Sequence, residues 1–177
     1  MAKKKPKSNI KWIITIFLVT FILSTIFSYF SVEITENMNL MTAIILLFLI
    51  ILFGVMMDLV AIATATADIN ALHAKASDKK KGAKSAIKLV KNASKVSSIC
   101  ADVIGDVCGI LSGSVGVLVA MEISRIYSIE LSIITLIVGG IVATCTVTGK
   151  AILKQFGINN ANEIVCFVGK ILEFYKK

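Results

Sequence analysis

Residues 37–57 read NMNLMTAIILLFLIILFGVMM and decide the class of this protein. The stretch carries no charged side chain, and the apolar run continues past Asp58 to Ala67. A helix needs roughly 20 mostly apolar residues to cross the hydrocarbon layer of a membrane. A soluble helix of this length would show a polar stripe that faces water, and this stretch has none. The stretch therefore predicts a transmembrane helix.

Three further stretches have the same character. Trp12 to Val32 and Leu131 to Gly149 contain no charge, and Val96 to Met121 is interrupted by Asp102 and Asp106 alone. The chain as a whole has a mean hydropathy of +0.87 and 17% charged residues, where a soluble domain has about 25%. We therefore predict an all-α integral membrane protein with four transmembrane helices.

The first apolar stretch follows the basic segment 1–11 and so has the outline of a signal peptide. It is longer than the apolar core of a signal peptide, and no small-residue cleavage site follows it. We therefore expect residues 12–32 to stay on the protein as a transmembrane helix.

The positions of the basic residues predict the orientation of the chain. Residues 1–11 contain five Lys, the 33–36 turn none, the 68–95 segment eight, the 122–130 turn one Arg and the 150–177 tail five Lys. Lys and Arg are concentrated in cytoplasmic loops of membrane proteins. Both termini and the central segment are therefore expected in the cytoplasm, beneath the cell membrane. The formal net charge of +8 is then explained by topology and by contact with anionic membrane lipid, and no nucleic-acid partner is expected.

The two basic segments outside the spans have helical patterns of their own. In 68–95, apolar residues recur at helical spacing on both sides of the Lys-rich turn 79–82, which predicts a juxtamembrane helical hairpin on the inner membrane surface. The 150–177 tail is expected to form a C-terminal amphipathic interfacial helix after a turn at 157–160. Its apolar stripe consists of Ile164, Phe167, Val168, Ile171, Leu172 and Tyr175.

No pattern in the chain predicts an enzyme or a bound cofactor. The four cysteines, Cys100, Cys108, Cys145 and Cys166, fall in or beside predicted helices and lack the close spacing of a zinc site. His73 has no nearby ligand-type residue in the sequence, and no nucleophile motif or phosphate-binding glycine loop is present.

Three acids interrupt the predicted spans: Asp58, Asp102 and Asp106. An ionisable group inside a membrane costs about 2.5–3.5 kcal/mol on insertion scales, so each is a candidate functional residue. Asp58 and Asp106 are each predicted at a depth of roughly 13–15 Å, counted at 1.5 Å per residue from the cytoplasmic side, and we expect them to meet. Helical spacing predicts that acids, glycines and a hydroxyl of the third span share one buried polar face. Its members are Asp102, Gly105, Asp106, Gly109, Ser112, Gly113 and Gly116.

Two interpretations of these acids remain open. Together with hydroxyls such as that of Thr146 on the fourth span, they form a set of hard oxygen ligands suited to Mg²⁺ or another divalent cation. Alternatively, the acids are protonated or hydrogen-bonded across helices and only hold the bundle together. Periodicity does not separate the two.

The order of these features resembles the transmembrane domain of the CorC and cyclin M magnesium-transporter family, over about residues 41–177. The family has a Phe-Ser-x-Ser-Glu-Thr-Ala-Leu type motif, a basic Gly-x-x-Ala-x-x-x-Leu-x-Leu hairpin, an Ile-Gly-Asn run and a Glu-Ile-x-Pro-Lys/Gln-Ala motif. The corresponding segments here are 53–61 with 69–72, 81–92, 104–106 and 146–152.

The resemblance implies a homodimer that binds partly dehydrated Mg²⁺ in an inward-facing cavity. Carried over by position, Asp58 and Asp106 become candidate metal ligands and Thr146 a weaker one, and Asp102 is an addition that could replace lost charge. The motif serines correspond to Val55 and Met57, which offer no side-chain ligand.

The correspondence covers a three-span core, residues 37–149, that includes the 68–95 hairpin. The span 12–32 is extra, and the CBS pair and acidic C-terminal domain of the family have no counterpart here. We therefore expect a homodimeric protein that binds or transports a divalent cation. The alternative is an accessory or assembly membrane protein that does not transport and that uses the Gly-rich helix face to bind a partner.

Overall fold

The computed structural model describes residues 10–36 and 39–175, and within these ranges it contains helices and no strand. Residues 1–9, which hold most of the predicted basic N-terminal segment, lie outside the described ranges. In chain order the elements are α1 (Ile10–Glu36), α2 (Leu40–Thr66), α3 (Ile69–Ser77), α4 (Ala83–Lys91), α5 (Ala93–Ser97), the π-helix η1 (Ser98–Gly105), α6 (Asp106–Tyr127), α7 (Leu131–Asn159) and α8 (Ala161–Tyr175).

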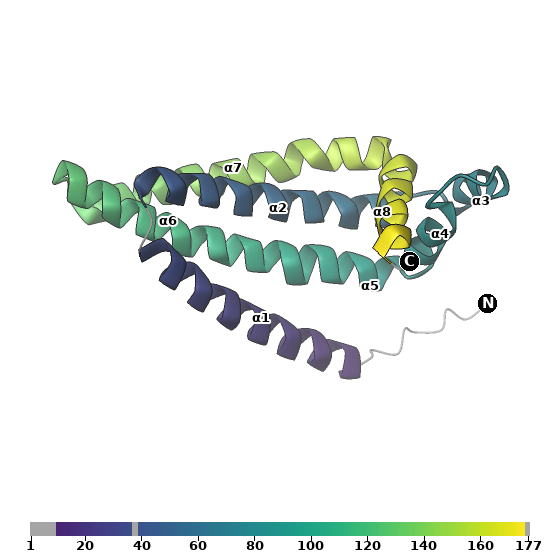
Figure 1. Cartoon of the computed structure of the whole chain (residues 1–177), viewed down its shortest axis with the longest axis horizontal. Helices are drawn as coiled ribbons and strands as arrows, with labels where there is room; N and C mark the ends of the chain where they lie inside the picture. The colour runs from purple at the N-terminus through teal and green to yellow at the C-terminus, as the bar shows by residue number, and fades with distance from the viewer. Residues whose placement is uncertain (1–9, 37–38, 176–177) are drawn as a thin grey trace, which may run out of the picture.

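Four of the described helices are long and apolar enough to cross a membrane, which confirms that part of the sequence prediction. They are found at Trp12–Tyr29, Leu40–Thr66, Ala93–Tyr127 and Leu131–Asn159. The third consists of α5, η1 and α6 in continuous succession. Figure 1 shows these helices running lengthwise, with α8 across one end and α3 and α4 beside it. We call this end the α8 end, and the end with the 128–130 turn the far end.

Two helices extend beyond their predicted ends. The turn expected at 33–36 is part of α1, which continues to Glu36, and α7 continues past Gly149 to Asn159. No proline lies in either extension, so nothing in the backbone stops these helices at the limits of their charge-free stretches. The extension of α7 places Lys150 inside a helix.

The third long helix lies at the centre of the bundle. Its apolar window is 56% buried, against 22% for α2, 6% for α7 and none for α1. Near the far end, α2, α6 and α7 share a cluster of buried side chains: Ala43, Leu47, Val115, Val119 and Val142. Farther along, Gly54 of α2 lies directly against Cys108, where an added Cβ would be 2.9 Å from the Cys108 Cβ. Small residues let helix backbones approach closely, and this contact needs one.

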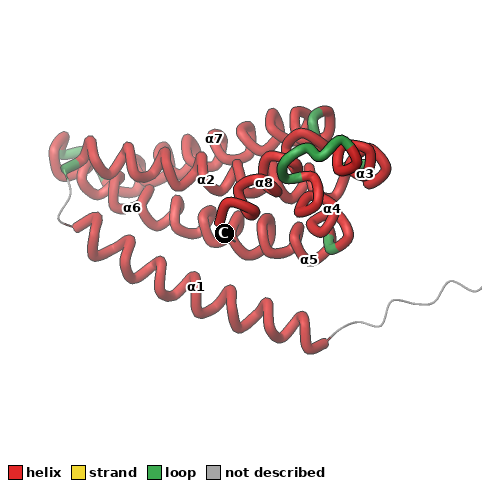
Figure 2. The backbone as a smooth tube through the Cα atoms, turned by 45° about the vertical axis from the view of Figure 1, so that its right-hand side comes forward, coloured by secondary structure: helices red, strands yellow, loops and turns green. Residues whose placement is uncertain are grey.

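The first helix leans away from the other three toward the α8 end (Figures 1 and 2). It packs mainly against α6 and η1. Near its start, the Lys95 ammonium lies 5.4 Å from the centroid of the Trp12 ring, which links α1 to α5 by a cation–π contact. The span that has no counterpart in the CorC resemblance is therefore the most loosely packed.

At the α8 end, helices α2, α3, α4 and α8 share a second buried cluster. Its members are Ala63, Leu72, Ala86, Ile87, Ala161 and Val165. Polar contacts fix α8 from the side: the Asp68 backbone N–H donates to Asn162 Oδ1 at 2.9 Å, and Lys75 pairs with Glu163. The hydrogen bond and charge of Lys75 lower the pKa of Glu163. The segment expected as a hairpin is thus two helices, α3 and α4, that pack on α8.

Helix α8 docks on α4 through two glycines. An added Cβ on Gly169 would lie 2.4 Å from the Gly82 carbonyl oxygen and 2.9 Å from the Ala86 nitrogen. Gly82 begins α4 with φ +86°, a conformation that side chains disfavour. The Glu173 carboxylate accepts hydrogen bonds from the Gly82 N–H at 3.0 Å and from Ser85 Oγ at 3.1 Å. A carboxylate at this place also complements the positive end of α4.

The apolar stripe predicted for the tail is largely exposed on α8. Phe167, Ile171 and Leu172 are exposed, while Val165 and Gly169 on another side of the helix are buried against the bundle. An apolar face outside the protein contact fits a helix that lies on a membrane surface. Its position in a membrane stays a prediction.

The Gly169–Gly82 contact can be tested with one methyl group. We expect Gly169→Ala to lower the melting temperature in detergent, with a loss of about 1–3 kcal/mol, because the added Cβ overlaps the α4 backbone. Labelling of Cys166, which lies on α8 and is half-buried, should accelerate as α8 separates from α4. The matched control is Gly140→Ala, since a Cβ on Gly140 has no atom within 4 Å. Equal stability of the two variants would contradict this account of α8 docking.

Candidate functional site

The first feature of the candidate site is an ion pair between two long helices. Lys150 Nζ of α7 lies 3.0 Å from Asp58 Oδ2 of α2, and the two side chains are 32% and 16% exposed. At 1.5 Å per residue the pair lies about 27–29 Å along these helices from Leu40 and Leu131. Charged groups inside membrane spans usually pair with each other. The carboxylate of Asp58 is therefore already compensated by a cation of the same chain.

The third long helix comes close to this pair at a glycine. A Cβ added to Gly105 would lie 3.1 Å from Asp58 Oδ1 and 3.4 Å from the Cys100 carbonyl oxygen. Gly105 is the last residue of the π-helix η1 and is buried. The ion pair thus joins α2 to α7, and the absence of a side chain at Gly105 lets η1 approach it.

The other two acids of the predicted site lie elsewhere. Asp102 and Asp106 are both exposed, and no group of three or more His, Cys, Asp or Glu side chains that could hold a metal ion occurs in the described part of the chain. The prediction of one buried face that includes both acids does not hold within the single chain. Gly109 and Gly113, which follow Asp106 at α-helical spacing on α6, are exposed as well, so this side of the helix is open. Asp102 lies within η1, whose i→i+5 hydrogen bonds change its spacing relative to α6.

Hydroxyl groups on α6 and α7 provide oxygen atoms near the helix interface. Ser112 is buried and its Oγ donates to the Gly109 carbonyl at 2.8 Å. Thr146 Oγ1 donates to the Val142 carbonyl, also at 2.8 Å. Each hydroxyl has used its one proton within its own helix, so its lone pairs remain available to accept a hydrogen bond or contact a cation.

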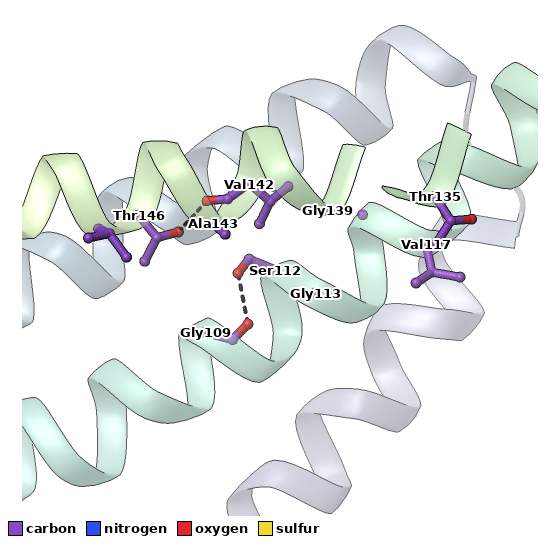
Figure 3. Close-up of a pocket in the computed structure, with 11 residues that line it drawn as sticks. Gly109, Ser112, Gly113, Val117, Thr135, Gly139, Val142, Ala143 and Thr146 are labelled. Atoms are coloured by element: carbon purple, nitrogen blue, oxygen red, sulfur yellow. Dashed lines mark hydrogen bonds between the residues drawn. The ribbon is translucent and has the colours of Figure 1, made fainter. Parts of the chain in front are cut away.

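These two hydroxyls lie on facing walls of a groove between α6 and α7, as Figure 3 shows. The groove has a volume of about 340 Å³ and is bordered mainly by small residues. Its lining consists of Gly109, Ser112, Gly113, Gly116, Val117, Thr135, Gly139, Val142, Ala143, Thr146 and Val147. We call it the α6–α7 groove. Of the predicted face, Gly109, Ser112, Gly113 and Gly116 line it, whereas Asp102, Gly105 and Asp106 do not.

A narrow void connects the α6–α7 groove with the ion pair. It has a volume of about 10 Å³ and shares Gly109, Ser112 and Thr146 with the groove, and Lys150 and Gly105 also line it. A space of this size corresponds to about one water molecule. The void reaches Lys150 but is lined largely by apolar and small residues, and Asp58 is not among them.

Lys150 is the site residue that sequence reasoning missed. The sequence analysis counts it as the first charge of a basic tail, because it follows the charge-free stretch 131–149. The usable signal was the absence of proline between Leu131 and Asn159, which allows one helix to continue through Lys150. A basic residue inside a span calls for an acidic partner, and Asp58 is the acid at the corresponding distance along α2.

No family model matches this chain, and no curated protein or solved structure matches it either. The resemblance to the CorC and cyclin M family therefore stays a prediction based on the motifs quoted above. The function is argued below from the geometry of the site, with that resemblance as a supporting consideration.

The ion pair can be tested by a double-mutant cycle. We expect Asp58→Asn and Lys150→Gln each to destabilise the protein in detergent by about 1–3 kcal/mol, because each leaves one charge without its partner in a partly buried place. The double variant should lose less than the sum of the two, as expected for groups in contact. Arg125→Gln is the control, since its exposed pair with Glu122 should contribute little. Additive losses at Asp58 and Lys150 would contradict a direct interaction.

Proposed function

We propose that this protein binds a divalent cation at Asp58, between α2, α6 and α7, and moves it across the cell membrane, with Mg²⁺ as the candidate ion. The observation that carries the proposal is the Asp58–Lys150 pair at the end of a hydroxyl-lined groove. Paired charges within membrane helices commonly mark the path of a transported ion.

The available ligands suit a hard cation. Asp58 offers a carboxylate, and Ser112 and Thr146 offer hydroxyl oxygens whose protons are already engaged. Mg²⁺ is usually held by one or two carboxylates and keeps several of its waters, so the Asp58 carboxylate would be the direct ligand. Ser112 lies about 10 Å along α6 from Gly105, the glycine beside Asp58, so the hydroxyls would contact the waters of the ion or line its path. The Lys150 ammonium takes the place of the cation in the present conformation, and a divalent ion would compete with it for the same carboxylate.

Binding of a hydrated cation requires a conformational change. The void beside Lys150 has a volume of about 10 Å³, which holds about one water molecule. In the proposed cycle Lys150 moves away from Asp58, α2 and α7 separate at this level, and the cation enters with its remaining waters. Return of Lys150 to Asp58 then releases it. The Asp58–Lys150 contact is thus the closed state of the site.

The proposed orientation places the α8 end in the cytoplasm, together with both termini. This end carries the eight Lys of residues 68–95, and Lys-rich segments favour the cytoplasmic side and anionic lipid headgroups. The exposed apolar stripe of α8 would then lie in the inner membrane surface beside the two helices α3 and α4.

A homodimer is part of the proposal because two carboxylates of the single chain would otherwise face lipid. Asp102 and Asp106 are exposed although both lie within the long helix Ala93–Tyr127. Exposure of charged groups to lipid is costly. A second copy that packs against this part of η1 and α6 would cover both acids and bring further carboxylates toward the cation.

Cation binding is tested by the effect of Mg²⁺ on the purified protein. We expect Mg²⁺ to raise the melting temperature and to enter liposomes that contain the protein, and Asp58→Asn to remove both effects. Lys150→Gln should instead increase the Mg²⁺-dependent stabilisation, because the competing ammonium is gone. A purely structural ion pair would not give this opposite response of its two partners.

Asp78→Asn is the matched control, since Asp78 is an exposed acid at the end of α3 and should leave both Mg²⁺ effects unchanged. Asp102→Asn with Asp106→Asn then measures what the exposed acids add. If the parent protein takes up no Mg²⁺ and is not stabilised by it, the proposal is refuted.

A second candidate function rests on the α6–α7 groove. A Cβ added to Gly109, Gly113 or Gly139 would have no atom within 4 Å, so this small-residue surface is not used within the chain. Surfaces of this kind accept a closely packed helix in membranes. The protein would then be an assembly component that associates through this groove, with a second copy as the first partner to test.

Two neighbouring glycines allow this to be tested. Gly139 lines the groove and Gly140 does not, yet both have open space for a side chain. We expect Gly139→Leu to abolish crosslinking between copies in liposomes, because the side chain fills the groove, and Gly140→Leu to leave it intact. Loss of association in Gly139→Leu without any Mg²⁺ effect in the parent protein would favour the assembly function. Equal crosslinking in the two variants would exclude the groove as the interface.

A further inference from the structure

The divergence of α1 from the bundle leaves a second and larger groove. It lies between α1, α2 and the η1–α6 helix and has a volume of about 710 Å³, within the range of small-molecule sites. All its lining side chains are apolar, and they include Leu23 and Phe27 of α1, Leu49 and Phe53 of α2, and Ile104 and Val107 of the third span. We call it the α1 groove.

We propose that the α1 groove is a binding site for a membrane phospholipid with an anionic headgroup, whose acyl chain lies between α1 and the bundle. The proposal does not depend on cation transport, since it concerns other residues on another side of α2 and α6.

The character of the lining favours an acyl chain over a protein helix. Helices that pack in membranes use Gly, Ala, Ser and Thr to bring backbones together, and the α6–α7 groove has four glycines. The α1 groove has no such residue among its lining and is bordered by Leu, Ile, Val, Phe and Cys. A flexible hydrocarbon chain can fit between such side chains, whereas a rigid helix cannot approach closely.

The complementary charge lies where α1 meets α5, about 12 Å along the third span from Val103, the first groove residue of that span. Lys95 lies over the Trp12 ring at 5.4 Å, and Trp is the residue that favours the headgroup level of a membrane. The acid nearest to Lys95 along the chain is Asp102 of η1, seven residues away. Lys84, Lys88 and Lys91 belong to α4, whose start holds the Glu173 carboxylate, so they are not counted here. Lys95 at the α1–α5 junction therefore attracts an anionic headgroup more strongly than a zwitterionic one.

The distances match the length of a lipid. Lys95 and Val107 are separated by about 18 Å along the third span at 1.5 Å per residue. One leaflet of a bilayer, with its headgroups, measures about 20 Å. A lipid with its phosphate at Lys95 therefore places its acyl chain against Ile104 and Val107.

The test uses the fluorescence of Trp12, the only tryptophan of the chain. The protein is reconstituted into vesicles of unlabelled phosphatidylcholine. One series then receives increasing fractions of doxyl-labelled phosphatidylglycerol, and a second series receives doxyl-labelled phosphatidylcholine, with the quencher near the start of the acyl chain in both. We expect labelled phosphatidylglycerol to quench Trp12 at a several-fold lower mole fraction. Lys95→Gln should reduce this preference by about fivefold, as expected for about 1 kcal/mol per basic residue near an anionic lipid, and Lys95→Arg should retain it.

Matched variants separate the groove from the surrounding lipid. Leu49→Phe narrows the α1 groove and should weaken the selective quenching, whereas Leu136→Phe makes the same change at an exposed site of α7 outside the groove and should not. Lys170→Gln controls for loss of a basic residue on α8. If the two labelled lipids quench Trp12 of the parent protein equally, the proposal is wrong. If the quenching curves of Leu49→Phe and Leu136→Phe are identical, the lipid does not bind in the α1 groove.

Discussion

A largely buried carboxylate needs a cation or a set of hydrogen-bond donors beside it, and Asp58, whose side chain is 16% exposed, meets this condition through Lys150. The contact joins α2 to α7 at a fixed level and so sets how far the two helices can slide past each other. At the same level, η1 approaches the Asp58 carboxylate through Gly105, where a side chain would be too close. The small void beside the α6–α7 groove reaches Lys150 of this pair, so the arrangement of the candidate site follows from it.

Close packing in the rest of the bundle depends on small residues rather than on large apolar ones. Lipid chains are as apolar as Leu, so burial of large side chains gives little advantage inside a membrane. Gly54 against Cys108 and Gly157 against Leu59 are contacts where an added Cβ would lie 2.9 Å from its neighbour. Three glycines of the α6–α7 groove, Gly109, Gly113 and Gly139, are different, because a Cβ on any of them would have no described atom within 4 Å. Small residues therefore form contacts between helices of the chain at Gly54 and Gly157, and in the α6–α7 groove they form a surface on which another helix could pack.

The two ends of the bundle are built by different means. The far end is closed by a short turn and an apolar cluster shared by α2, α6 and α7. The α8 end holds a separate layer in which α8 is fixed by Gly82, Gly169 and Glu173 and by the Lys75–Glu163 pair. A single residue, Asn160, lies between α7 and α8, so the helix that carries Lys150 leads directly into the helix that packs on α4.

The sequence by itself determined the four long apolar helices, because the length of a charge-free stretch is a property of the chain alone. It also identified Asp58 as a residue that needs a partner and the glycines that line the α6–α7 groove. The partner of Asp58 was decided only by the tertiary structure, since Lys150 is distant in sequence and lies in a helix that continues past its apolar stretch. The exposure of Asp102 and Asp106 was decided there too, because the helices pack so that the side of α6 with Asp106, Gly109 and Gly113 stays exposed, and a sequence pattern does not say which side of a helix its neighbours cover.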